Sequence, residues 1–134
     1  MRLATTGKNR KPQYWIVGAM YHGRDDQAPK FIKHGYWLLG WKEKDAHNQI
    51  GKRGLIVAGD RIAIKRMMGQ GASKILITAL GIVTDVDKDD KDRRVYVNWA
   101  ATDLRRVVDA HGALQAISGP FEPDNEWIRE VFQL

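Results

Sequence analysis

The residue types most suited to chemistry lie in the stretch from Gly23 to Trp41. It opens on a charged loop made of Arg24, Asp25, Asp26 and Gln27. Carboxylate and carboxamide oxygens accept hydrogen bonds, for example from the exocyclic amine of a nucleobase. Aromatic side chains follow the loop at Tyr36, Trp37 and Trp41. A polar loop beside aromatic faces is typical of a binding pocket, whereas a lone tryptophan would suit a hydrophobic core.

A short helix is expected to connect the loop to the aromatic residues. Pro29 suits the first turn of a helix, the run that ends at His34 is amphipathic, and Gly35 suits the C-terminal cap. Aromatic residues directly after a helix end lie at the end of an element, where side chains can line a cleft. We therefore interpret the stretch as one that forms a pocket.

Two histidines in the same stretch make a metal-dependent hydrolase an alternative. The residues His22, Asp25, Asp26 and His34 are of types that bind zinc or manganese. The histidines flank the expected helix, however, and lack the i, i+4 spacing of a helical metal pair. We therefore expect a protein that is not an enzyme and has no metal or cofactor, and we keep the hydrolase as the weaker alternative.

Alternating and apolar runs predict several short strands joined by tight turns. The expected strands are Tyr14–Met20, Arg61–Lys65, Ile75–Val83 and Arg94–Trp99, with a turn at Ala58–Asp60 and a glycine-rich hairpin loop at Met67–Lys74. Helices are expected at Ala101–Ala110 and Asn125–Phe132, a surface loop at Lys42–Lys52, and a turn at Ile117–Pro120. This order predicts an α+β domain in which a strongly curved mixed sheet, or small barrel, buries one core.

Composition indicates one globular domain with a basic surface. Hydrophobic residues make up 43% of the 134 residues and charged residues 28%, which suits a single domain at 13–134 behind a flexible basic arm at 1–12. The net charge of +6 favours a polyanionic partner. The chain has no cysteine, no apolar run long enough for a membrane span and no apolar core of a signal peptide. We therefore expect a cytoplasmic protein without a membrane partner.

Six short motifs follow one another along the chain: YWIVGA, RDDQ, FIKHGYW, AGDRIAIK, ITALGIV and VYVNW. Their order resembles the PUA-like superfamily, and within it the EVE and YTH domains, over nearly all of residues 14–134. The resemblance implies a PUA-like curved sheet with short flanking helices. It also implies a reader of methylated or hydroxymethylated bases, similar to those of McrB-type restriction systems and other modification-dependent nucleases. Such domains hold the base in an aromatic cage.

The resemblance assigns the pocket residues one by one. Trp37 matches the tryptophan after the helix-terminal glycine, which forms one wall of the cage. The loop that offers polar side chains to the base edge corresponds to Asp25, Asp26 and Gln27. The hairpin that carries a second cage tryptophan in YTH proteins is TDVDKDDKD here and has no aromatic residue. Either Tyr21, Trp41 or Met67 is therefore expected to form the second wall, or the cage is incomplete.

Basic residues are expected to contact the nucleic-acid backbone at Lys33, Lys65, Arg66 and Lys74. We therefore predict a nucleic-acid-binding domain that recognises a modified base, in DNA more than in RNA, by base flipping if the base lies in a duplex. A nuclease or AAA+ motor is the expected companion module. The alternative from a different class is a protein-interaction or small-ligand module with an aromatic pocket.

Overall fold

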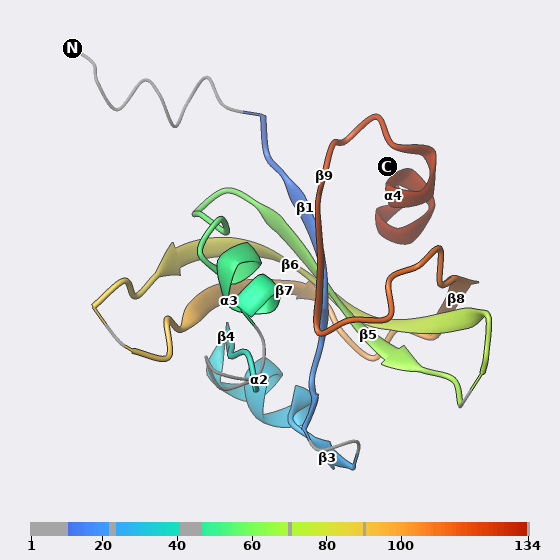
Figure 1. Cartoon of the computed structure of the whole chain (residues 1–134), viewed down its shortest axis with the longest axis horizontal. Helices are drawn as coiled ribbons and strands as arrows, with labels where there is room; N and C mark the ends of the chain where they lie inside the picture. Colours follow the sequence, from blue (N-terminus) through green and yellow to red (C-terminus); the bar gives the residue numbers. More distant parts are fainter. Residues whose placement is uncertain (1–10, 22–23, 41–46, 70, 90, 134) are drawn as a thin grey trace.

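The computed structural model describes residues 11–21, 24–40, 47–69, 71–89 and 91–133, which form a mixed α+β fold around one curled sheet (Figure 1). The strands of this sheet are β1 (Tyr14–Gly18), β4 (Tyr36–Trp37), β5 (Arg61–Met67), β6 (Lys74–Val86), β7 (Val95–Ala101), β8 (Arg106–Asp109) and β9 (Ile117–Phe121). Their order is β4-β7-β6-β5-β1-β9, and β8 also pairs with β6. The α+β class and the curved mixed sheet are thus confirmed.

Strand β1 lies inside the molecule because both of its faces are apolar. It runs parallel to β5 and antiparallel to β9. Trp15 and Val17 point into one core, and Tyr14 and Ile16 point into a second core on the other face of the sheet. The expected single core is therefore divided into two by the sheet.

Each core is closed by short helices (Figure 1). Helices α2 (Ala28–His34) and α3 (His47–Arg53) cover the first, and α4 (Glu126–Phe132) covers the second. Gly35 ends α2 in the left-handed conformation, at φ 73°, and its N–H bonds the Phe31 carbonyl oxygen. Asn125 caps α4 by accepting from the Ile128 N–H. The expected helices at both places are confirmed.

The helix expected at 101–110 is wrong, because this segment bends and then forms β8. Burial alternates along β8, because Val108 is buried between exposed Val107 and Asp109, as in a half-buried strand. Val108 pairs with Ile75 of β6. The two neighbouring arginines and the nearby Gly112 favoured a helix in the sequence, but tertiary pairing decides otherwise.

The loop expected at 42–52 is also wrong where the structure describes it, since α3 begins at His47. Its buried face is polar, so the sequence does not show the helical repeat of apolar residues by which such a helix is usually recognised. The Gln49 side chain accepts from the Ile117 N–H at 2.6 Å, and Arg53 donates to the Asp92 carbonyl oxygen at 3.1 Å. Buried polar partners thus replace the apolar stripe.

The turn expected at 117–120 is in fact β9, an edge strand beside β1. Glycine and proline suit a turn, but an edge strand tolerates proline, and the register with β1 shifts between Tyr14 and Ile16. Residues 1–10 of the expected arm lie outside the described residues. Among the described helices, none has the length and apolar character that a membrane crossing requires.

Candidate functional site

A pocket of about 490 Å³ opens on the α2 face of the sheet. One side is formed by the small hairpin of β2 (Met20–Tyr21) and β3 (Asp25–Asp26) together with the start of α2. The floor is formed by β5 and β6, and the far side by residues 102–105. Four separate segments of the chain therefore meet at one cavity, which is large enough for a small organic ligand such as a nucleobase.

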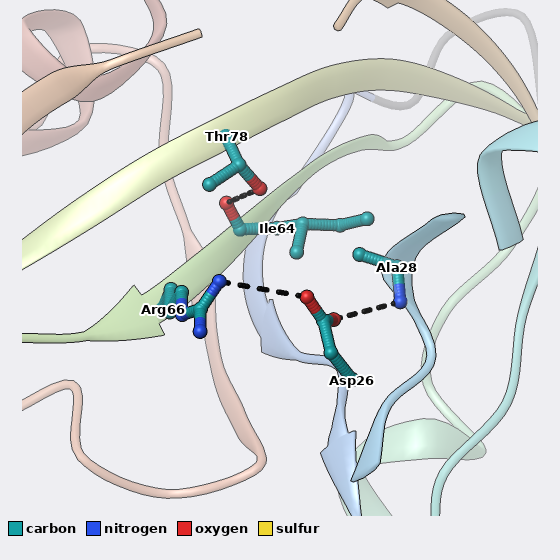
Figure 2. Close-up of polar contacts among 5 residues, drawn as sticks. All are labelled: Asp26, Ala28, Ile64, Arg66 and Thr78. Carbon is teal, nitrogen blue, oxygen red and sulfur yellow. Dashed lines mark hydrogen bonds and ion pairs between the residues drawn. The ribbon is translucent and has the colours of Figure 1, made fainter. Parts of the chain in front are cut away.

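Asp26 places a carboxylate at the mouth of this pocket. Its Oδ1 accepts from the Ala28 N–H at 3.0 Å, which fixes the carboxylate against the first turn of α2. Its Oδ2 lies 3.6 Å from Nη1 of Arg66 on β5. Figure 2 shows the two side chains pointing toward each other, Asp26 from the small hairpin and Arg66 from β5. The pair is solvent-exposed and longer than an ideal charged hydrogen bond, so both groups remain accessible to a ligand.

The pocket floor contains a bulge between β5 and β6. Ile64 pairs with Ala79 and Lys65 with Ile77, so Thr78 is the extra residue on β6. The Thr78 hydroxyl donates to the Ile64 carbonyl oxygen at 3.4 Å (Figure 2). The bulge thus brings Thr78 of β6 into the same pocket lining as Ile64 and Arg66 of β5.

The far wall is the bend that follows β7. Asp103 has a positive φ of 56°, a conformation that aspartate tolerates better than most residues. The Leu104 N–H then bonds the Thr78 carbonyl oxygen at 3.0 Å, which holds the bend against the floor. Arg105 is exposed on this wall. The pocket therefore has an arginine on the floor strand and a second arginine on the far wall.

Apolar side chains form much of the remaining lining: Met20, Pro29, Ile32, Leu76 and Leu104. Apolar walls with a few polar groups are typical of pockets that bind small molecules. None of the described residues that line it is aromatic. The described part of the pocket is therefore an aliphatic slot with a polar edge, which differs from the expected aromatic cage.

Trp37 does not line this pocket, which corrects the expectation that it forms a cage wall. Its side chain is 0% exposed, and its indole N–H donates to the Gly18 carbonyl oxygen at 2.8 Å. The physical reason is that β4 begins directly after Gly35 and pairs with β7. The aromatic residues after the helix therefore enter the sheet and the core, and no indole face is free for a base.

Tyr21 is half-buried beside the same core. Its hydroxyl donates to the Leu38 carbonyl oxygen at 2.9 Å, and its ring meets the Phe31 ring edge-on. Burial, with smaller contributions from Tyr36 and Asp92, raises the pKa of Tyr21 to about 12. Tyr21 is a packed side chain outside the pocket lining.

The neighbours of Asp26 that were predicted to line the pocket do not do so. Asp25 is exposed and pairs with Tyr21 in the small hairpin, outside the lining. Gln27 precedes α2, and its backbone bonds Ala19 and Phe31. Trp41 lies outside the described residues. Within the described part of the chain, Asp26 is the predicted base-reading residue that reaches the pocket.

Of the basic residues predicted to contact a nucleic-acid backbone, Arg66 and Lys33 are exposed. Lys74 is exposed too, but it forms an ion pair with Asp109, Nζ to Oδ1, at 2.7 Å. Lys65 corrects the expectation: its ammonium is buried and donates to the Ala113 and Gln115 carbonyl oxygens. Burial lowers the pKa of Lys65 to about 8. Lys65 thus holds the segment 113–115 on the far face of the sheet.

The described residues do not assemble the metal site considered for a hydrolase. No group of three or more possible ligands occurs among them. His34 lies in the last turn of α2 and stacks on Tyr36, whereas Asp25 and Asp26 precede the first turn. His22 lies outside the described residues.

Sequence reasoning missed Thr78, Leu104 and Arg105. Thr78 becomes part of the site only through the bulge, which the sequence does not reveal. The far wall had a usable signal, because Thr-Asp directly after the strand that contains Trp99 is typical of a turn. No protein-family model, curated protein or solved structure matches this chain.

Proposed function

We propose that this chain is a nucleic-acid-binding domain of the PUA-like, EVE/YTH type, and that the pocket between β3, β5 and residues 102–105 takes one modified base. The observation that carries the proposal is the position of Asp26 beside Arg66 at the mouth of a pocket large enough to admit a nucleobase. A hydrogen-bond acceptor and a donor are therefore available side by side, above apolar walls.

This pair of groups complements one kind of base edge. Adenine and cytosine present an amine next to a ring nitrogen that accepts, whereas guanine, thymine and uracil present a carbonyl next to a ring N–H. Asp26 accepts from the amine, and the Arg66 guanidinium donates to the ring nitrogen. Hydrogen bonds to charged groups contribute about 1.5–3 kcal/mol each. The proposed ligand is thus an amine-bearing base.

The apolar lining supports recognition of a modification. A methyl group that is buried against such walls contributes on the order of 0.8 kcal/mol. Extrusion of a base from a duplex costs a few kcal/mol, so the contacts must offset this cost when the ligand is double-stranded. The net charge of +6 supplies attraction to phosphate that falls as salt rises. We propose DNA as the polymer and a nuclease or AAA+ motor as the companion module.

The test is equilibrium binding of the full chain to matched single-stranded and duplex oligonucleotides at two salt concentrations. Each oligonucleotide is unmodified or carries N6-methyladenine, 5-methylcytosine or 5-hydroxymethylcytosine at one position. A preference for one modified base that persists at the higher salt supports the proposal. Equal and salt-sensitive binding to all oligonucleotides contradicts it, and absence of binding favours the protein-interaction alternative.

A further inference from the structure

The floor of the pocket continues beyond its lining onto β8. Across three adjacent strands, Arg66 of β5 pairs with Leu76 of β6, and Leu76 pairs with Val107 of β8. Side chains in one such row share a face of the sheet. Because Arg66 and Leu76 line the pocket, Val107 lies on the pocket side, about 10 Å from β5 across two strand spacings.

Burial on the other face confirms this orientation. The neighbours in sequence, Ile75 and Val108, are buried in the core beneath α4. Val107 is instead 49% exposed. An exposed valine on a strand that borders a pocket is an apolar contact surface with no described segment covering it.

Cations surround this valine on its own face. Arg105 is two residues away along the chain and forms part of the pocket wall. Lys74 pairs with Asp109 in the next row of the sheet. Together with Arg66, the face carries three cations around an apolar centre, and two carboxylates lie beside them, Asp109 next to Lys74 and Asp26 next to Arg66. An apolar centre with a cationic margin complements a nucleotide, which has an apolar base face and an anionic phosphate.

We propose that this face, made of Arg66, Leu76, Arg105 and Val107 and called here the β8 platform, binds the nucleotide next to the base in the pocket. The base or sugar of that nucleotide packs on Val107, and its phosphate lies near Arg66 and Arg105. The inference rests on the proposed function, because it needs a base in the adjoining pocket. The platform adds a second contact, which forms only when the nucleic-acid ligand extends beyond the base in the pocket.

The experiment compares a mononucleotide that carries the preferred base with oligonucleotides that extend it by one, two and four nucleotides. The platform predicts a large gain in affinity for the first one or two additions. Val107→Asp weakens binding of the extended ligands at least about fivefold, as loss of contact on half of a valine side chain predicts. It leaves binding of the mononucleotide unchanged.

Leu114→Asp is the matched control, because Leu114 is also exposed, at 57%, and the charge change is identical. It is expected to change binding of neither ligand. Arg105→Ala is a second variant that does not alter β8. It is expected to lower the slope of log K against log salt by about 0.7 for the extended single-stranded ligands.

The two proposals fail in different ways. If extended ligands bind no tighter than the mononucleotide, or if Val107→Asp and Leu114→Asp weaken them equally, the platform is overturned while base recognition stands. If no ligand binds, or if the modification makes no difference to any ligand, the pocket is not a base reader and both proposals are overturned.

Discussion

Asp26 and Arg66 face each other across the mouth of the pocket, with Oδ2 and Nη1 3.6 Å apart. Asp26 comes from a two-strand hairpin outside the main sheet, and Arg66 from a strand of the main sheet. An exposed pair at this distance contributes little to stability. The fold therefore depends little on this pair, and the role that we propose for it is ligand binding.

Asp26→Asn should reduce the preference for amine-bearing bases about tenfold, because the carboxamide replaces an acceptor oxygen by a donor and removes the charge. The ratio of dissociation constants for methylated adenine or cytosine against uracil measures this preference. Asp25→Asn is the control, since Asp25 lies on the same hairpin outside the pocket lining. Equal effects of both variants on the ratio would count against a reading role for Asp26.

Trp37→Ala should destabilise the fold by about 3–5 kcal/mol, because it opens a cavity in the core and leaves the Gly18 carbonyl oxygen without the indole N–H. Urea unfolding followed by circular dichroism measures the loss. A Trp37→Ala protein of normal stability that no longer binds a modified base would restore the aromatic-cage interpretation.

Asp60→Asn should lower the free energy of unfolding by about 3 kcal/mol. The buried carboxylate accepts from the Trp15 indole at 2.9 Å and from the backbone N–H groups of Gln13 and Val57. The NH₂ group of an asparagine side chain would face N–H groups that now donate to the carboxylate. A buried polar group left without a partner costs about 1–3 kcal/mol. Exposed Asp124 provides the control variant Asp124→Asn, which should be neutral in the same urea titration; a neutral Asp60→Asn would refute this network.

Lys65 should make stability rise with pH in a defined window. Its pKa is about 8 in the folded protein against an ordinary value of 10.5, so between these pH values the unfolded chain binds one proton more than the folded chain. The free energy of unfolding of the wild type, relative to that of Lys65→Met, should therefore rise by up to ~1.4 kcal/mol per pH unit from about pH 8 to 10.5.

Tyr21 changes stability with pH in the opposite direction to Lys65. Because Tyr21 is present in both proteins, its contribution cancels when the wild type is compared with Lys65→Met. The pKa of Tyr21 rises from 10.0 to about 12 on folding, so Tyr21 costs both proteins stability above pH 10. Urea unfolding at half-unit pH steps gives the difference. A difference that stays constant from pH 7 to 10 would show that Lys65 remains fully charged in the folded state.

The strands and capped helices were predictable because their signals are local. The alternation in RIAIK predicted β5, and Pro29 with Gly35 predicted both ends of α2. Helix α3 was missed because Gln49 and Arg53, which are polar, occupy its buried face. Strand β9 was missed because only its pairing with β1 explains a strand that contains glycine and proline.

The site was less predictable than the fold, because pairing between distant strands assembles it. Asp26 was recognised from its loop, and Arg66 from its charge. The pocket between them depends on the bulge at Thr78 and on the bend at Asp103. Trp37 was assigned to the pocket because its place after a helix resembles a cage position, whereas pairing with β7 determines that it is core.

The most direct measurement of the central claim is a titration of the isotope-labelled chain with the preferred modified mononucleotide, followed through backbone amide shifts in NMR spectra. A base that binds beside Asp26 and Arg66 should shift the amides of Ala28, Arg66, Thr78 and Leu104, which surround the pocket. Shifts confined to the opposite face near Ala113, or no shifts at saturating ligand, would contradict the assignment of this pocket as the base-binding site.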